Sequence, residues 1–345
     1  MPWLICGTFP STRPDLVYGQ AGDCVASGLA ATLCAEAGLG HSAGEAGLPG
    51  GADRADRAGT SGEDHLSLLC HGADSVHALP IARGTPALAA AAAITAREMG
   101  GQAPYLLMAG DTGRGEGSRR VYTFLHDRVA SFAGWGITFH YLLPDVDWHN
   151  RLLMAFRELP QRPVLCADAG YMYAAKMSGY AAEYDLFTPD AGELAFLADE
   201  DAPHPFYTRG FLLAEEEDAP AHIARAYAHG NAAASMLVKG KCDMVVRRGE
   251  IVDQIDTPGV PHLEPIGGTG DTVAGIATGL LAAGMPMLHA CSLAARANRH
   301  MGNLAQPTPA TRIDELLAFL PQALRLAVKD VRYVESCGSG GGRAI

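Results

Sequence analysis

A carboxylate enclosed by glycines is the feature of this sequence best suited to chemistry. Asp271 lies in the run 266–285, IGGTGDTVAGIATGLLAAGM, in which Gly267, Gly268 and Gly270 precede it and small apolar residues recur at helical spacing after it. The glycines therefore fall in the turn that opens a helix, where backbone N–H groups and the helix dipole attract an anion. Asp271 either caps this helix or acts as a base beside a bound phosphate. The density of glycines favours the base.

A lysine and an acidic pair follow two other predicted strands. Lys239 and Gly240 end one strand, where the ammonium group would reach a nucleotide phosphate, although a solvated lysine in a turn is the simpler explanation of this pair alone. Asp190 and Glu193, in TPDAGE, lie one helical turn apart. Paired acids suit a magnesium ion that keeps its water shell, so Glu193 would act through water. A capping box between the two residues explains the same spacing.

A third glycine-rich turn, 106–118, reads LLMAGDTGRGEGS and contains Gly110 and Asp111. It would wrap a substrate or a phosphate, but it lacks the Gly-Lys-Ser/Thr ending of a Walker loop and does not fit the dinucleotide fingerprint. Asp111 also begins an Asp-Thr-Gly triplet, as in aspartic proteases. That mechanism needs two carboxylates that share a proton, and the sequence has no second triplet. Asp168 ends a further strand, where it would face the same cleft or cap a helix.

Four residues in HYLLPDVDWHN, namely His140, Asp145, Asp147 and His149, are dense enough in nitrogen and oxygen donors for a zinc site. We reject this interpretation. His140 would lie inside a predicted strand, and the two aspartates follow a proline in an ordinary acidic loop. A histidine in such a place is usually only hydrogen-bonded.

Alternating strand and helix patterns must position these side chains. Short apolar runs that are typical of buried parallel strands occur at 105–109, 137–143, 163–167, 184–187 and 235–238. Helical patterns occur between and around them at 86–99, 118–131 and 219–229, and the segment from Asp271 to Val328 is all helical. The alternation predicts a mostly parallel sheet covered by helices, with an antiparallel hairpin at 243–255 on its edge. Ligands of such sheets bind beyond the carboxyl ends of the strands, so the turns above would share one cleft.

Length and composition bound the remaining possibilities. We expect 345 residues, 48% of them apolar, to form a single α/β domain over 1–336, with a flexible insertion at 36–64 and a disordered tail at 337–345. The net charge of −12 argues against nucleic acid or an anionic membrane as a partner. Eight scattered cysteines and the lack of a membrane-length apolar run suit a cytoplasmic protein. We leave a homo-oligomer open.

The order of these turns resembles the ribokinase-like superfamily, and most closely its NAD(P)H-hydrate dehydratase branch. The similar segments cover that branch's anion hole with its Asp, its lysine-glycine strand end, its T-P-H-P-G-E helix start and its D-A-D strand end. They are GGTGDTVAG at 267–275, LVKGKCDMVV at 237–246, LFTPDAGELAFLA at 186–198 and PVLCADAG at 163–170. More loosely, 106–118 resembles the G-P-G-L-G turn, and 84–100 resembles the first glycine-alanine helix. The resemblance runs from about 84 to 305.

This resemblance implies a three-layer ribokinase-like fold that binds ATP or ADP and Mg²⁺. The nucleotide would contact Lys239, Gly240 and the turn made of Gly267, Gly268, Thr269 and Gly270, while Asp271 would take the proton of a substrate hydroxyl. Gly110, Asp111, Asp168 and Asp190 would face the small-molecule substrate, and Glu193 would hold the metal through water. The substrate would be hydrated NAD(P)H or another hydroxyl compound.

Several substrate-side positions depart from the family pattern. Asp190 replaces its histidine, Ala191 replaces the proline after it, and Cys166 replaces the first Asp of D-A-D. These changes keep a second hypothesis open, a sugar or other small-molecule kinase of the same superfamily. The dehydratase is the first hypothesis. A third is a nucleotide sensor without turnover, which would have no need of the base at Asp271.

Overall fold

The computed structural model describes residues 1–12, 15–26, 66–72, 75–204 and 218–338. Eleven strands of this part of the chain form one sheet, in the order β11-β10-β9-β8-β7-β6-β1-β5-β2-β3-β4. Six central strands, from β9 to β5, run parallel, and both edges are antiparallel. The strands are β1 (Trp3–Pro10), β2 (Leu16–Ala26), β3 (Leu66–His71), β4 (Val76–Pro80), β5 (Tyr105–Asp111), β6 (Gly136–His140), β7 (Val164–Ala167), β8 (Leu186–Phe187), β9 (Ser235–Val238), β10 (Asp243–Arg247) and β11 (Glu250–Ile255).

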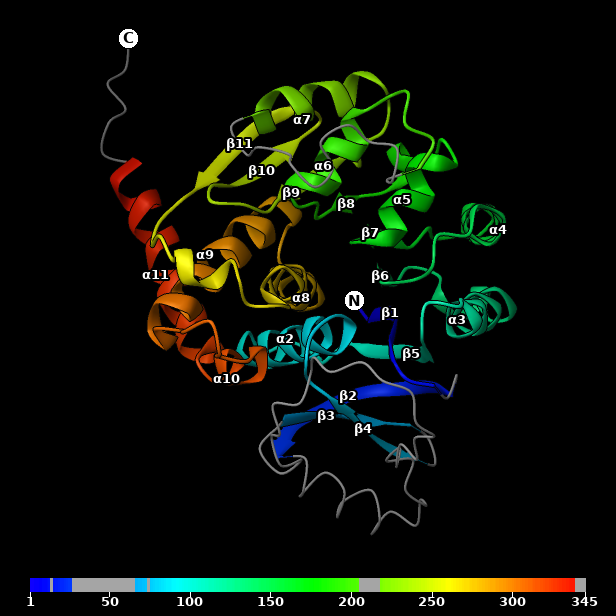
Figure 1. Ribbon diagram of the computed structural model, residues 1–345, viewed down its shortest axis with the longest axis horizontal. Coiled ribbons are helices and arrows are strands. Elements are labelled where there is room, and N and C mark those ends of the chain that lie inside the picture. Colours follow the sequence, from blue (N-terminus) through cyan, green and yellow to red (C-terminus); the bar gives the residue numbers. More distant parts are fainter. Residues whose placement is uncertain (13–14, 27–65, 73–74, 205–217, 339–345) are drawn as a thin grey trace, which may run out of the picture.

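Helices cover the two faces of this sheet, so the fold has three layers (Figure 1). One layer contains α2 (Thr85–Glu98), α8 (Thr269–Ala282), α9 (Met287–Ala305), α10 (Ile313–Leu317) and α11 (Leu320–Gly338). The other contains α3 (Glu116–Asp127), α4 (Val146–Arg157), α5 (Gly170–Met177), α6 (Ala191–Ala198) and α7 (Ala219–Ala228). Each layer buries its own apolar cluster against the sheet, which confirms the α/β architecture expected from the sequence.

The expected strands from 105 to 238 and the helices expected at 86–99, 118–131 and 219–229 are present, with ends that differ by a few residues. The helices α4 and α5 were not expected, and Asp145 and Asp147, which were placed in a loop, lie at the start of α4. The antiparallel hairpin at the edge is also present, as β10 and β11. The amino-terminal part differs, because four strands that the sequence pattern did not indicate lie before residue 84. β1 enters the centre of the sheet, and β2, β3 and β4 extend it into a second antiparallel edge.

The helices α2 and α8 pack against each other along an unusually close contact that positions the site. A Cβ atom on Gly275 would overlap the carbonyl oxygen of Leu88, and one on Gly279 would lie 2.5 Å from that of Ala92. Only glycine lets the two helix backbones come so near. The buried face of α2 is a run of alanines, which adds to the close approach. The amino-terminal ends of both helices therefore lie side by side.

Two predicted segments lie largely outside the described residues. The insertion expected at 36–64 falls within 27–65, and the expected tail at 337–345 overlaps α11 by two residues, since this helix ends at Gly338. The single-domain prediction for 1–336 stays a prediction. Among the helices of the described residues, none is long and apolar enough to cross a bilayer.

Candidate active site

Asp271 lies in the first turn of α8 and is held by two donors from other parts of the chain. Its Oδ2 accepts the backbone N–H of Gly84 at 2.6 Å, and its Oδ1 lies 3.1 Å from His140 Nε2. Burial alone would raise the pKa of this carboxyl, but the hydrogen bond and charge of His140, with Lys239 and the Gly84 amide, lower it below its ordinary value. Asp271 is therefore ionised at neutral pH and is fixed in one orientation.

His140 orients this carboxylate from the end of β6. The ring is fully buried, and its Nδ1 lies 3.0 Å from the hydroxyl of Thr85 at the start of α2. Because an ionised Asp271 can only accept, His140 Nε2 carries the proton of their hydrogen bond. The strand β6, the helix α2 and the helix α8 thus converge on a single carboxylate.

Lys239 lies at the end of β9. Its Nζ is 2.9 Å from Asp168 Oδ1 and 3.9 Å from Glu193 Oε2. It also lies 3.7 Å from the position that a Cβ on Gly270 would occupy, so the ammonium group borders the glycine turn. The other oxygen of Asp168, Oδ2, is buried without a hydrogen-bond partner in the described residues and lies 3.9 Å from His140 Nε2.

The charges of this cluster are strongly coupled. Burial would lower the pKa of Lys239, but the carboxylates of Asp168, Glu193 and Asp190 raise it above its ordinary value. Burial also raises the pKa of Glu193 to about 8, helped by Asp190 and Asp168 and opposed by Lys239. Lys239 is therefore a permanent cation, while Glu193 is a carboxyl that changes charge near neutral pH.

The glycine turn before Asp271 offers backbone donors. Gly268 has φ 102°, and the amides of Gly270 and Asp271 meet no acceptor within the described residues, as is usual for the first amides of a helix. The Thr269 hydroxyl donates instead to the carbonyl oxygens of Leu263 and Ile266, at 3.3 and 3.1 Å. Of the residues predicted for this turn, Thr269 thus ties the turn to the preceding segment through its side chain.

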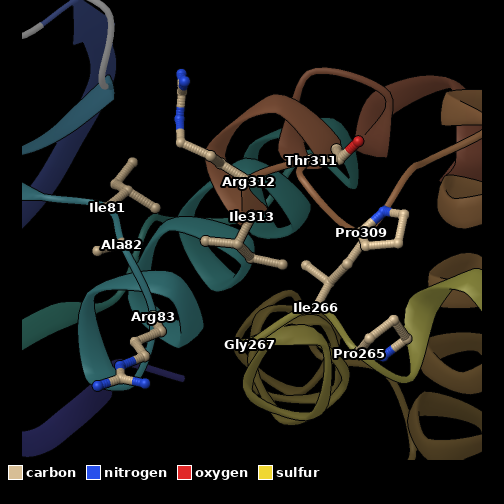
Figure 2. Close-up of a pocket in the computed structure, with 10 residues that line it drawn as sticks. All are labelled: Ile81, Ala82, Arg83, Pro265, Ile266, Gly267, Pro309, Thr311, Arg312 and Ile313. Atoms are coloured by element: carbon tan, nitrogen blue, oxygen red, sulfur yellow. The ribbon is translucent and has the colours of Figure 1, made fainter. Parts of the chain in front are cut away.

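A pocket of about 280 Å³ adjoins the turn at Gly267. Ile313 of α10 projects toward Ile266 across it, and Arg83 extends from the segment before α2 (Figure 2). The Arg83 side chain passes 3.8 Å from the position that a Cβ on Gly267 would occupy. The residues that line the pocket are Ile81, Ala82, Arg83, Pro265, Ile266, Gly267, Pro309, Thr311, Arg312 and Ile313. Arg83, which the sequence analysis did not single out, is therefore a second cation beside the turn.

Asp190 and Glu193 form a capping box at the start of α6. Asp190 Oδ1 accepts the Glu193 amide at 2.8 Å, and the Asp190 amide donates to Glu193 Oε2 at 2.9 Å. The helix-capping explanation of their spacing is thus realised. Glu193 still reaches the cluster, since it is buried near Lys239 and accepts from the Tyr173 hydroxyl at 3.5 Å. Its metal role stays a prediction.

Asp111 stabilises its own turn. Its two oxygens accept the amides of Gly113, Gly115 and Ser118, each at 3.0 Å. Burial opposes ionisation, but these hydrogen bonds lower the pKa of Asp111 below its ordinary value. Among the contacts of the described residues, none joins Asp111 to Asp271. The substrate contacts predicted for Gly110 and Asp111 stay predictions.

The four residues weighed for a zinc site serve separate structures. His140 contacts Asp271, while Asp145 caps α4 by accepting the amide of Trp148. Asp147 pairs with an arginine on the surface of α4, and His149 lies buried, 2.9 Å from the Tyr184 hydroxyl. The structural role of His140 was missed because a histidine in a strand carries no motif of its own.

Cys166, which replaces an aspartate of the family pattern, lies in the core. It is buried on the face of the sheet that α8 covers, and burial raises the pKa of its thiol well above the ordinary value. Its change from aspartate therefore alters the packing behind the site. This weakens one of the sequence arguments for a different substrate.

Comparison with known proteins identifies the family. A sequence model described as NAD(P)H-hydrate dehydratase matches residues 143–321, which is more than half of the chain. The chain belongs to the NAD(P)H-hydrate dehydratase family. The segment matched by the family contains Asp168, Glu193, Lys239 and Asp271, which confirms the resemblance seen in the sequence. Gly84, which holds Asp271, lies before that segment.

Two relatives match this chain over different lengths. An uncharacterised protein of Methanocaldococcus jannaschii is 36% identical over 225 residues, which are 65% of this chain and 92% of that protein. The bifunctional NAD(P)H-hydrate repair enzyme of Hyperthermus butylicus is 37% identical over 101 residues, 29% of this chain and 18% of the enzyme. This chain therefore matches a small part of that family enzyme, although it spans most of the first relative.

Two solved kinases align at low similarity. Pyridoxal kinase from Staphylococcus aureus, in complex with AMP-PCP and pyridoxal, has a TM-score of 0.43 and 17% identity, over 62% of this chain and 81% of that chain. Phosphofructokinase-2 from Escherichia coli, in complex with potassium, has a TM-score of 0.39 and 16% identity, over 58% of this chain and 62% of that chain.

Proposed function

We propose that this protein is an ATP- or ADP-dependent NAD(P)H-hydrate dehydratase. The observation that carries the proposal is the Asp271 carboxylate, held by the Gly84 amide and His140 at the start of α8 and beside the glycine turn. Such a carboxylate suits the removal of a proton from a hydroxyl that attacks a phosphate bound at the turn. Membership of the family supports hydrated NAD(P)H as the compound that carries the hydroxyl.

The proposed reaction has two steps. The oxygen of the hydroxyl on the hydrated nicotinamide ring forms a bond to the terminal phosphorus of the nucleotide, the bond from that phosphorus to the leaving nucleotide breaks, and Asp271 takes the proton. The carbon–oxygen bond to the new phosphate then breaks, with the electron pair of the ring nitrogen in support. Loss of a proton from the neighbouring carbon restores the double bond of NAD(P)H, so the net products are NAD(P)H, phosphate and the shortened nucleotide.

Lys239 and the turn would hold the nucleotide. The ammonium group lies beside Gly270, where it would neutralise phosphate charge, and the amides of Gly270 and Asp271 would donate to the terminal phosphate. A site built this way works by positioning and by stabilising charge. The other predicted contacts, at Gly240, Gly267, Gly268 and Thr269, belong to the same proposal.

The residues beside Lys239 fit a magnesium ion. Asp168 Oδ2 is buried without a hydrogen-bond partner in the described residues, and Glu193 adds a second carboxylate. Hard oxygen donors in this number suit Mg²⁺, which keeps most of its waters and touches one or two carboxylates. When bound, the ion would neutralise the charge on the phosphates. Asp168 and Glu193 would hold it through its waters.

A small-molecule kinase is the second candidate. It would use Asp271 and the turn in the same way, but the phosphate would stay on the product. The observation in its favour is Asp190, an exposed carboxylate that stands where the family has a histidine. A carboxylate there would accept hydrogen bonds from the hydroxyls of a sugar.

The test gives the purified protein hydrated NADH with Mg²⁺ and either ATP or ADP, and follows the absorbance of the reduced nicotinamide. We expect a rise that requires nucleotide and that Asp271→Asn lowers by roughly 10²–10⁴-fold while nucleotide affinity stays within a few-fold. Asp147→Asn, on the exposed face of α4, is the matched control. No rise, with nucleotide binding intact, would contradict the dehydratase. An active Asp271→Asn variant would contradict the base.

A further inference from the structure

We propose that Tyr141 is the surface against which the ring of the substrate packs, and that the substrate of this site is therefore a cyclic compound. The inference rests on the proposed function and deepens it, since the hydrated nicotinamide ring is such a compound. Tyr141 follows His140 directly at the end of β6. The contacts of its ring with His140 and Gly84, the two residues that hold Asp271, carry the inference.

The backbone of Tyr141 is held in a conformation that tyrosine rarely adopts. Its φ is 47°, in the left-handed region that favours glycine, and the Thr8 hydroxyl donates to its carbonyl oxygen at 2.6 Å. Strained backbone of this kind persists where the surroundings impose it, and it concentrates at ligand sites. Glycine would remove the strain at this position, so the presence of a large aromatic side chain requires a reason.

The ring of Tyr141 lies against the two residues that hold Asp271. Its centroid is 4.3 Å from that of His140, with the ring planes at 76°, and its edge lies 3.5 Å from the position that a Cβ on Gly84 would occupy. The residue is nevertheless 51% exposed. An aromatic side chain that is half open and next to the catalytic carboxylate is available to a ligand.

The charges around this ring agree with the same placement. Burial raises the pKa of Tyr141 to about 12, with further increases from Asp271, Asp168 and Glu193 and an opposing effect of Lys239. The ring thus lies within electrostatic reach of the whole cluster, and its hydroxyl is neutral at physiological pH. A neutral ring adds contact area without repelling the phosphates of a nucleotide.

Geometry then limits what the site accepts. A hydroxyl that gives its proton to Asp271 must approach within about 3 Å of the carboxylate. The atoms that carry this hydroxyl consequently lie near the groups that hold Asp271, and the exposed Tyr141 ring lies against two of these groups. A cyclic substrate gains apolar contact with the Tyr141 ring there, whereas a short open chain gains little.

The test measures kcat and KM for hydrated NADH and for the nucleotide in Tyr141→Ala and Tyr141→Phe. We expect the alanine variant to raise KM for the hydrate by roughly tenfold, because apolar contact with the substrate ring is lost, with KM for the nucleotide within about twofold of the wild type. The phenylalanine variant keeps the ring and should behave as the wild type. Leu143→Ala is the matched control, because Leu143 is an exposed apolar side chain of the same turn, 41% exposed.

Direct binding separates this inference from the proposed function. Hydrated NADH is titrated calorimetrically into Asp271→Asn and into the double variant Asp271→Asn with Tyr141→Ala, both in the absence of nucleotide so that no turnover occurs. Weaker binding to the double variant supports this contact even where the wild type shows no dehydratase activity. Equal binding to both overturns the inference and leaves the function standing. A joint rise in KM for hydrate and nucleotide in Tyr141→Ala also overturns it, since that indicates a structural role.

Discussion

The backbone amide of Gly84 donates to the Asp271 carboxylate at 2.6 Å across 187 residues of sequence. Gly84 immediately precedes α2, and Asp271 lies in the first turn of α8, so the close packing of these helices creates the contact. Gly84 has φ 69°, and its open position also leaves room for the Tyr141 ring. One glycine therefore links the candidate base, the helix contact and the exposed tyrosine.

Changing Gly275 to Ala should test this link. The new Cβ would overlap the carbonyl oxygen of Leu88, so α2 and α8 must move apart, and overpacking of this kind costs about 1–3 kcal/mol. We expect a lower free energy of unfolding and a fall in kcat, since the Gly84 amide moves away from Asp271. Urea unfolding and steady-state kinetics measure the two effects. Gly259→Ala is the control, because a Cβ there would meet only Asp256 O at 3.8 Å. Equal stability of both variants would show that the helices tolerate a wider spacing.

Changing His140 to Phe should move the pH dependence of turnover. The hydrogen bond and charge of His140 lower the pKa of Asp271, so their loss raises that pKa and shifts the acid limb of kcat/KM to higher pH. We also expect kcat to fall by roughly tenfold, because the carboxylate loses an orienting donor. A pH–rate profile checks the shift, with the surface variant His126→Asn as control. An unchanged acid limb would mean that another group governs it.

Replacing Lys239 by Met should destabilise the protein through Asp168. The change leaves a buried carboxylate without its cation, a loss of about 3–5 kcal/mol for a broken buried pair. A second change, Asp168→Asn, removes the stranded charge and should recover much of the free energy of unfolding. Nucleotide affinity should stay low in the double variant, because the proposed phosphate contact is still missing. Recovery of both properties together would argue that Lys239 has only a structural role.

Glu193 should make stability fall as pH rises. Burial raises its pKa from 4.5 to about 8 in the folded protein, so the folded state binds this proton more tightly than the unfolded state does. The stabilising contribution is complete below pH 4.5, declines as pH increases through the interval and is lost above about 8. Glu193→Gln should flatten this decline when the free energy of unfolding is measured between pH 5 and pH 8. A decline of the same slope in the variant would assign it to another group.

Much of the fold was accessible from local sequence patterns. Alternation of apolar runs with helical periodicity identified β5 to β9 together with α2, α3 and α7, since burial on both faces of a parallel strand leaves a continuous apolar segment. β1 to β4 were missed. β2 and β3 are consecutive in the chain but are separated by residues 27–65, so no short hairpin turn marks them.

The sequence predicted those residues of the candidate site that belong to short, recognisable motifs. The glycines around Asp271 and the pair Lys239-Gly240 follow from turn chemistry, which depends on neighbours in sequence. Asp190 and Glu193 illustrate the limit of such patterns, because one spacing predicts both a metal site and the capping box that the structure contains.

The sequence by itself determined the α/β class, the glycine turn and the identity of the charged residues, because each depends on short-range periodicity or on one side chain. Only the tertiary structure decided that His140 and the Gly84 amide hold Asp271, that Lys239 pairs with Asp168 and that the Tyr141 ring lies against His140. These contacts join segments that are distant in the chain, and their geometry arises from the packing of α2 against α8 and from the order of strands in the sheet. Neither the helix packing nor the strand order can be predicted from the spacing of residues in the sequence.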